Sequence, residues 1–133
     1  MNLNKRNGMN TETRTEVTPR DIDAVLVRFL YDAHGFAERT AHTADFLLAN
    51  HKDLLATIFY GWAYDIEMMM AGLSTSEPER SILHLSAASL AYSAKLPDEA
   101  RLMAERGLVG NPPEEIADDL REVLKKLDEE EKS

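Results

Sequence analysis

The residues best placed to do chemistry lie close together in the first half of the chain. Glu38, His42 and Asp45 stand at i, i+4 and i+7, so on a helix their side chains project from one face. His34 precedes them by about one turn. Inward-facing Glu and His side chains can hold a metal ion inside a helical bundle. A metal-dependent helical-bundle enzyme that uses Glu38, His42 and Asp45 is therefore one alternative function.

Other features argue against catalysis. The Glu-x-x-His pairs that bundle metal sites carry on two helices do not occur in the chain. There is no nucleophile elbow and no glycine-rich phosphate loop. The chain has no cysteine, which removes disulfides, thiolate metal ligands and cysteine nucleophiles together. We therefore expect a protein that is not an enzyme and that carries no metal and no cofactor.

The charge balance narrows the class of partner. The formal net charge is −9, which opposes binding to a nucleic-acid backbone and to an anionic membrane surface. A basic protein partner would be attracted instead. The first seventeen residues lack the apolar core of a signal peptide. We expect a cytoplasmic protein that binds another protein, and neither nucleic acid nor a membrane.

Apolar residues recur at helical spacing along most of the chain, and no segment alternates with period two. The sequence therefore predicts an all-α fold, a compact bundle of about six antiparallel helices. These are expected near residues 18–34, 36–49, 53–71, 77–95, 97–107 and 112–127. Residues 1–17 are expected to be a disordered arm, 18–127 a single helical domain, and 128–133 a solvated acidic tail.

Two local patterns support these boundaries. Thr18 can cap a helix whose first residue is Pro19, with Asp21 in the position of a capping-box acid. Gly35 is a residue type that commonly ends a helix.

The helix expected over 53–71 carries a wide apolar stripe, which predicts its buried face. The stripe is formed by Leu55, Ile58, Phe59, Trp62, Ile66, Met69, Met70 and Leu73. Tyr60, Tyr64 and Met68 are offset from it, so this helix is expected to bury more than one side. A neighbouring subunit could supply the extra burial, and a homodimer is one expected assembly.

Small residues stand at Ala88, Ala100, Ala104 and Gly107, and Pro112 follows them. Two antiparallel helices approach closely only where small side chains stand at the crossing. With these spacings, residues 81–112 resemble a tetratricopeptide repeat, a helix–turn–helix unit of about 34 residues. The same region also looks like the C-terminal part of certain small uncharacterised bacterial proteins, a likeness that implies a bacterial-type origin and no activity.

The tetratricopeptide resemblance implies a groove that holds an extended peptide, lined by the first helix of the hairpin. Carried onto this chain, the groove residues are Leu85, Ser89, Tyr92 and Ser93. The predicted function is a non-enzymatic protein-interaction module or adaptor, with a capping helix after the hairpin. An alternative within binding proteins is a small acidic neutraliser of a basic partner, of the antitoxin or immunity-protein type.

Overall fold

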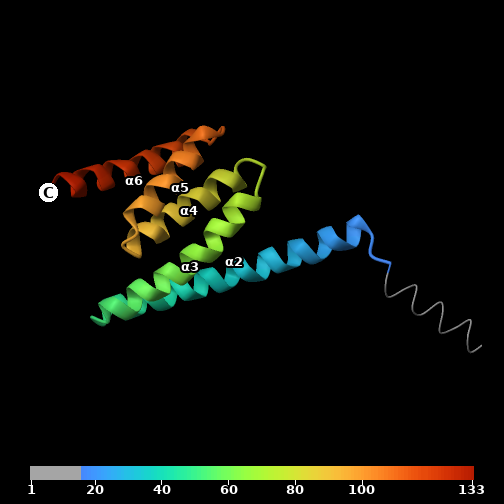
Figure 1. Cartoon of the computed structure of the whole chain (residues 1–133), viewed down its shortest axis with the longest axis horizontal. Coiled ribbons are helices and arrows are strands. Elements are labelled where there is room, and N and C mark those ends of the chain that lie inside the picture. The colour runs from blue at the N-terminus through green and yellow to red at the C-terminus, as the bar shows by residue number, and fades with distance from the viewer. Residues whose placement is uncertain (1–15) are drawn as a thin grey trace, which may run out of the picture. The chain divides into compact units, whose positions relative to one another are not determined.

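The computed structural model describes residues 16–133, and those residues form five helices and no strand (Figure 1). The helices are α2 (Pro19–Ala49), α3 (Asp53–Leu73), α4 (Glu79–Ser93), α5 (Pro97–Val109) and α6 (Glu114–Lys132). The predicted all-α fold class is confirmed. The expected number of six helices is not, because the first two expected helices are one. Over residues 16–133, no helix is long and apolar enough to cross a membrane.

The helix α2 runs through Gly35 without a break. A glycine ends a helix by adopting a left-handed backbone, and none of the described glycines has a positive φ. Contacts on either side hold the helix together: His34 pairs with Glu38 at 2.7 Å, and the Thr40 hydroxyl donates to the Phe36 carbonyl at 2.8 Å. These bonds and the continuing backbone ladder offset the roughly 1 kcal/mol that an internal glycine costs.

Residue contacts divide the chain into two units, Met1–Asp32 and Ala33–Ser133. In the first unit, residues 16–32 are described, and they contain the start of α2. The predicted capping box is present: the Asp21 backbone N–H donates to Thr18 Oγ1 at 3.2 Å, and Thr18 Oγ1 donates to the Asp21 carboxylate at 2.8 Å.

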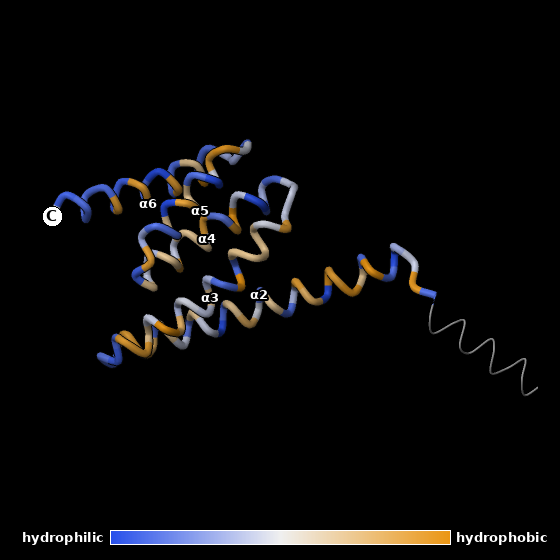
Figure 2. Tube along the Cα trace, viewed as in Figure 1, coloured by the Kyte–Doolittle hydropathy of each residue, from blue (hydrophilic) through white to orange (hydrophobic). Residues whose placement is uncertain are grey.

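No residue from 16 to 29 is buried. The expected inner face of this segment is instead exposed, and its side chains are Ile22, Val25, Leu26 and Phe29. Figure 2 shows hydrophobic and hydrophilic turns alternating along this part of α2. The stripe exists as the spacing predicts, but among residues 16–32 there is no second element to cover it.

In the second unit, α3 packs on α4, α4 on α5, and α6 on both α4 and α5 (Figure 1). Small residues dominate the core, and the larger side chains Tyr64, Met103, Leu120 and Leu127 fill the remaining space. The small core residues are Ala87, Ala88, Ala91, Ala100 and Ala104. Because alanines allow close approach of helix axes, α4 and α5 can form a tight hairpin. A second cluster joins Ala44, Ala56, Tyr60 and Ala94.

The helices α2 and α4 end in the same way. His51 has φ 62° and Lys95 has φ 60°, both in the left-handed region. After α4, the Leu96 N–H donates to the Ala91 carbonyl at 2.9 Å and the Lys95 N–H to the Tyr92 carbonyl at 3.1 Å. This is the Schellman pattern, which satisfies the last carbonyls of a helix and reverses the chain. This chain reversal explains how the short linkers 50–52 and 94–96 join α2 to α3 and α4 to α5.

The buried face of α3 differs from the predicted stripe. The core-facing residues are Ala56, Tyr60, Ala63, Tyr64, Glu67, Met70 and Ala71. Of the predicted stripe, Leu55, Ile58, Trp62, Met69 and Leu73 are exposed. Small residues and tyrosines allow the neighbouring helices to approach closely, whereas the bulky stripe lies on the opposite side. Within residues 33–133, α3 thus buries one side, and burial of a second side by a neighbouring subunit stays a prediction.

The predicted acidic tail is helical, because α6 continues to Lys132. Arg101 on α5 holds this end of α6, with its guanidinium 2.9 Å from Asp128 and 3.5 Å from Glu131. The Tyr92 hydroxyl on α4 donates to Glu130. The last turns of α6 are therefore attached to the hairpin that precedes them.

Candidate binding groove

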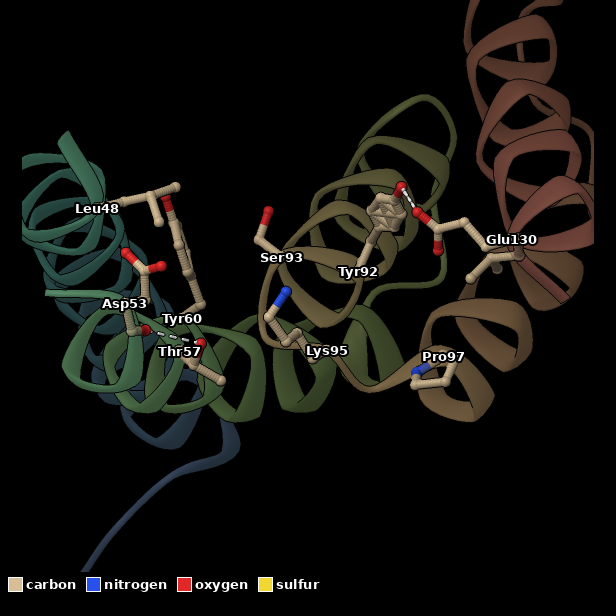
Figure 3. A pocket seen from close by; sticks show the side chains of 10 residues that line it. Leu48, Asp53, Thr57, Tyr60, Tyr92, Ser93, Lys95, Pro97 and Glu130 are labelled. Carbon is tan, nitrogen blue, oxygen red and sulfur yellow. Dashed lines mark hydrogen bonds between the residues drawn. The ribbon is translucent and has the colours of Figure 1, made fainter. Parts of the chain in front are cut away.

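A groove of about 500 Å³ opens where the ends of several helices of the second unit meet (Figure 3). Its walls come from the end of α2, the start of α3, the α4–α5 turn and the end of α6. The lining residues are Leu48, Asp53, Thr57, Tyr60, Tyr92, Ser93, Lys95, Pro97, Leu127 and Glu130. Two tyrosine rings, two carboxylates and one ammonium group thus share one concave surface.

Tyr60 is fixed on one wall of the groove. Its ring belongs to the cluster formed with Ala44, Ala56 and Ala94, and its hydroxyl donates to the Asp45 carboxylate. Burial, reinforced by the hydrogen bond and the negative charge of Asp45, raises the pKa of Tyr60 to about 12. The phenol therefore stays protonated at neutral pH and acts as a fixed donor.

Tyr92 occupies the opposite wall (Figure 3). Its hydroxyl donates to Glu130, a bond that raises the pKa of Tyr92, and burial adds to the effect. The end of α6 that carries Glu130 is held by Arg101. Both tyrosines are thus oriented by acids from other helices, and Tyr92 is partly exposed whereas Tyr60 is only 7% exposed.

The structure brings together half of the predicted groove residues. Tyr92 and Ser93 line the groove. Leu85 is partly buried and packs against the core, and Ser89 is exposed outside the groove lining. The sequence missed Tyr60 because it lies off the main stripe of its helix, and it missed Glu130 because that residue falls in a run expected to be a solvated tail.

The predicted metal ligands are not brought together. Glu38 pairs with His34, Asp45 accepts the Tyr60 hydroxyl, and His42 is exposed. Across residues 16–133 no three His, Asp or Glu side chains lie in a position to hold a metal ion. One helical face therefore carries three side chains, but at least two of them serve different neighbours.

A different cluster joins α2 to α3. His34 Nδ1 lies 2.9 Å from Glu67 Oε1, and His34 Nε2 lies 2.7 Å from Glu38 Oε1. Since both ring nitrogens face carboxylate oxygens, the arrangement requires a doubly protonated ring or a protonated carboxyl group. Glu67 is only 2% exposed, and its second oxygen, Oε2, has no hydrogen-bond partner. Burial raises the pKa of Glu67, and the neighbouring His34 opposes that shift.

The Glu67→Gln variant is expected to raise the free energy of unfolding at pH 7 by about 1–2 kcal/mol. A carboxyl group whose pKa is raised in the folded state adds stability that is complete below its unfolded value near 4.5 and is lost as the pH rises through the folded value. The variant removes the buried ionised form, so its advantage should shrink toward pH 4. Urea unfolding at pH 4, 5.5 and 7 measures this difference.

The matched control is Glu38→Gln, which alters the exposed carboxylate on the same histidine and should change stability by less than about 1 kcal/mol. If Glu67→Gln were less stable than the parent at pH 7, the ionised Glu67–His34 pair would be a net source of stability.

His84 is a buried histidine on α4. Its Nδ1 lies 2.8 Å from the Arg80 carbonyl oxygen, and burial lowers the pKa of its imidazole. A neutral ring that bonds to its own helix plays a packing role.

Comparison of the chain with protein-family models, with curated proteins and with solved structures gives no match.

Proposed function

We propose that the protein is a non-enzymatic interaction module and that its groove binds an extended segment of a partner protein. The observation that carries this proposal is the pairing of Tyr60 and Tyr92 across one groove, each hydroxyl fixed by a carboxylate. A preorganised concave surface with aromatic walls needs little ordering before it binds, which favours affinity.

The hairpin of α4 and α5 supports a tetratricopeptide-like reading of this surface. Ala88 on α4 and Ala100 and Ala104 on α5 are all fully buried, and Gly107 is buried beside them. Under this proposal α4 is the first helix of the unit, and it supplies Tyr92 and Ser93 to the groove. The capping role falls to α6, which covers α4 and α5 through Leu120 and Leu127.

The partner segment is expected to be basic. Asp53 and Glu130 outnumber Lys95 among the charged lining residues, and Asp45 lies directly behind Tyr60. The whole chain carries a net charge of −9, so its field also guides basic partners toward it.

A second candidate is the acidic neutraliser, which the composition of α6 favours. Every charged side chain of Glu114–Lys132 is exposed, and the acids outnumber the bases. A basic protein covered by this helix would be held by charge over a broad surface rather than by insertion into the groove. The two candidates therefore differ in which surface a partner contacts.

If a partner protein binds in the groove, variants that alter the groove should no longer capture that partner. The tagged protein and two variants would be used to capture partners from lysate of the cells that naturally produce it. The double variant Tyr92→Ala with Glu130→Gln removes one wall of the groove. We expect it to capture at least tenfold less of the partner that the parent protein captures in stoichiometric amount. Mass spectrometry identifies and quantifies what stays bound.

The matched control is Glu122→Gln, which removes one acid from the same helix outside the groove and should retain the partner. A partner kept by the double variant but lost when several α6 acids are neutralised would favour the neutraliser. Absence of any stoichiometric partner for the folded parent protein would contradict both candidates.

A further inference from the structure

The side of α3 that faces away from the core is largely apolar, and it is here called the α3 outer face. Its exposed apolar side chains are Leu54, Leu55, Ile58, Trp62, Met68, Met69 and Leu73, with exposed fractions between 36% and 77%. After the first residue of the helix, Asp65 is the only charged residue exposed on α3. The chain as a whole is 29% charged, so this face departs from the composition of the remaining surface. Apolar patches of this kind mark interaction sites.

The spacing within the face suits a partner helix. Leu55, Phe59, Trp62, Ile66, Met69 and Leu73 follow one another in alternating steps of four and three residues, the pattern of a helix–helix seam.

The size and chemistry of the face point to its occupant. The exposed side chains present on the order of 700 Å² per copy, close to the roughly 800 Å² that each partner contributes to a standard interface. A basic partner would find only one acid on this face to pair with. A second copy of the chain offers a face of the same area, equally poor in charge.

We infer that a second copy of this chain covers the α3 outer face, with the two α3 helices packed antiparallel about a two-fold axis. One register pairs every member of the seam. Leu55 then meets Leu73 of the second copy, Phe59 meets Met69, and Trp62 meets Ile66.

A local feature agrees with this register. A hollow of about 350 Å³ at the start of α3 is lined by His51, Lys52, Asp53, Leu54, Leu55 and Ile58. It lies where the antiparallel register places Leu73 of the second copy, so an exposed leucine at one end of α3 has a receiving site at the other. The inference is independent of the proposed groove, since Tyr60 lies on the core-facing side of α3.

The first test is the solution mass of the full chain by sedimentation, with Trp62 emission recorded on dilution. The parent protein should be a dimer whose single tryptophan emission shifts to longer wavelength as it dissociates. Trp62→Glu should raise the dissociation constant at least a hundredfold with helix content unchanged by circular dichroism. The matched control Leu102→Glu alters an exposed leucine on α5 and should leave the mass unchanged.

The register has its own test, because the chain contains no cysteine. Under oxidising conditions the double variant Leu55→Cys with Leu73→Cys should give a disulfide-linked dimer in high yield. Either single variant should remain largely unlinked. A monomeric parent protein at millimolar concentration would overturn the dimer. Efficient linkage of Leu55→Cys alone would overturn the antiparallel register.

Discussion

Leu120→Ala is expected to lower the free energy of unfolding by about 2–5 kcal/mol, the usual range for truncating a fully buried leucine. Leu120 is 0% exposed and is among the largest fully buried side chains of residues 16–133. It attaches α6 to the α4–α5 hairpin. A Cβ added at Gly107 would lie 2.9 Å from Leu120 Cδ1, so the leucine occupies the space that the missing side chain leaves open.

Urea unfolding followed by circular dichroism measures the loss. Leu124→Ala is the matched control, because Leu124 lies one turn further along α6 and is only partly buried; its loss should be clearly smaller. A loss below about 1 kcal/mol for Leu120→Ala would mean that α6 does not pack on the hairpin as described.

The parts of the fold that the sequence predicted are those determined within a few turns of chain. The capping box of Thr18 and Asp21 depends on residues three apart. The burial of Ala88, Ala100 and Ala104 follows from small residues at the spacing of a helix crossing. Such features need no knowledge of distant segments, and periodicity also identified the helical class.

The buried side of α3 could not be read from periodicity. The helix carries a bulky apolar stripe and a second face of alanines and tyrosines, and a periodic pattern does not say which face meets the protein's own core. The close packing of α3 on its neighbours selects the small side. The burial of Glu67 could not be predicted for a related reason. Its partner His34 stands 33 residues earlier in the chain, and only the folded chain brings the two together.

The groove was predictable only where one helix supplies it. Tyr92 and Ser93 could be predicted as groove residues from the resemblance of the hairpin to a tetratricopeptide repeat. Tyr60 and Glu130 reach the same surface from α3 and α6, so their contribution depends on how three helices meet. Glu130 also stands in an acidic run that continues α6 and contacts the hairpin through Arg101 and Tyr92.

The hairpin makes a second strong prediction, for Ala100→Leu. Ala100 is 0% exposed on α5 and belongs to the core cluster with Ala87, Ala88 and Ala91 of α4. Three extra carbon atoms at this site must push the two helices apart or adopt a strained rotamer. We expect the free energy of unfolding to fall by about 1–3 kcal/mol.

The control for Ala100→Leu is Glu105→Leu, which places the same side chain on the exposed side of α5 and should change stability by less than about 0.5 kcal/mol. Urea unfolding of both variants separates overpacking from a general effect of added leucine. A neutral Ala100→Leu would show that α4 and α5 tolerate a wider separation. The tight crossing on which the tetratricopeptide-like proposal depends would then be absent, while the groove tyrosines could still be tested by partner capture.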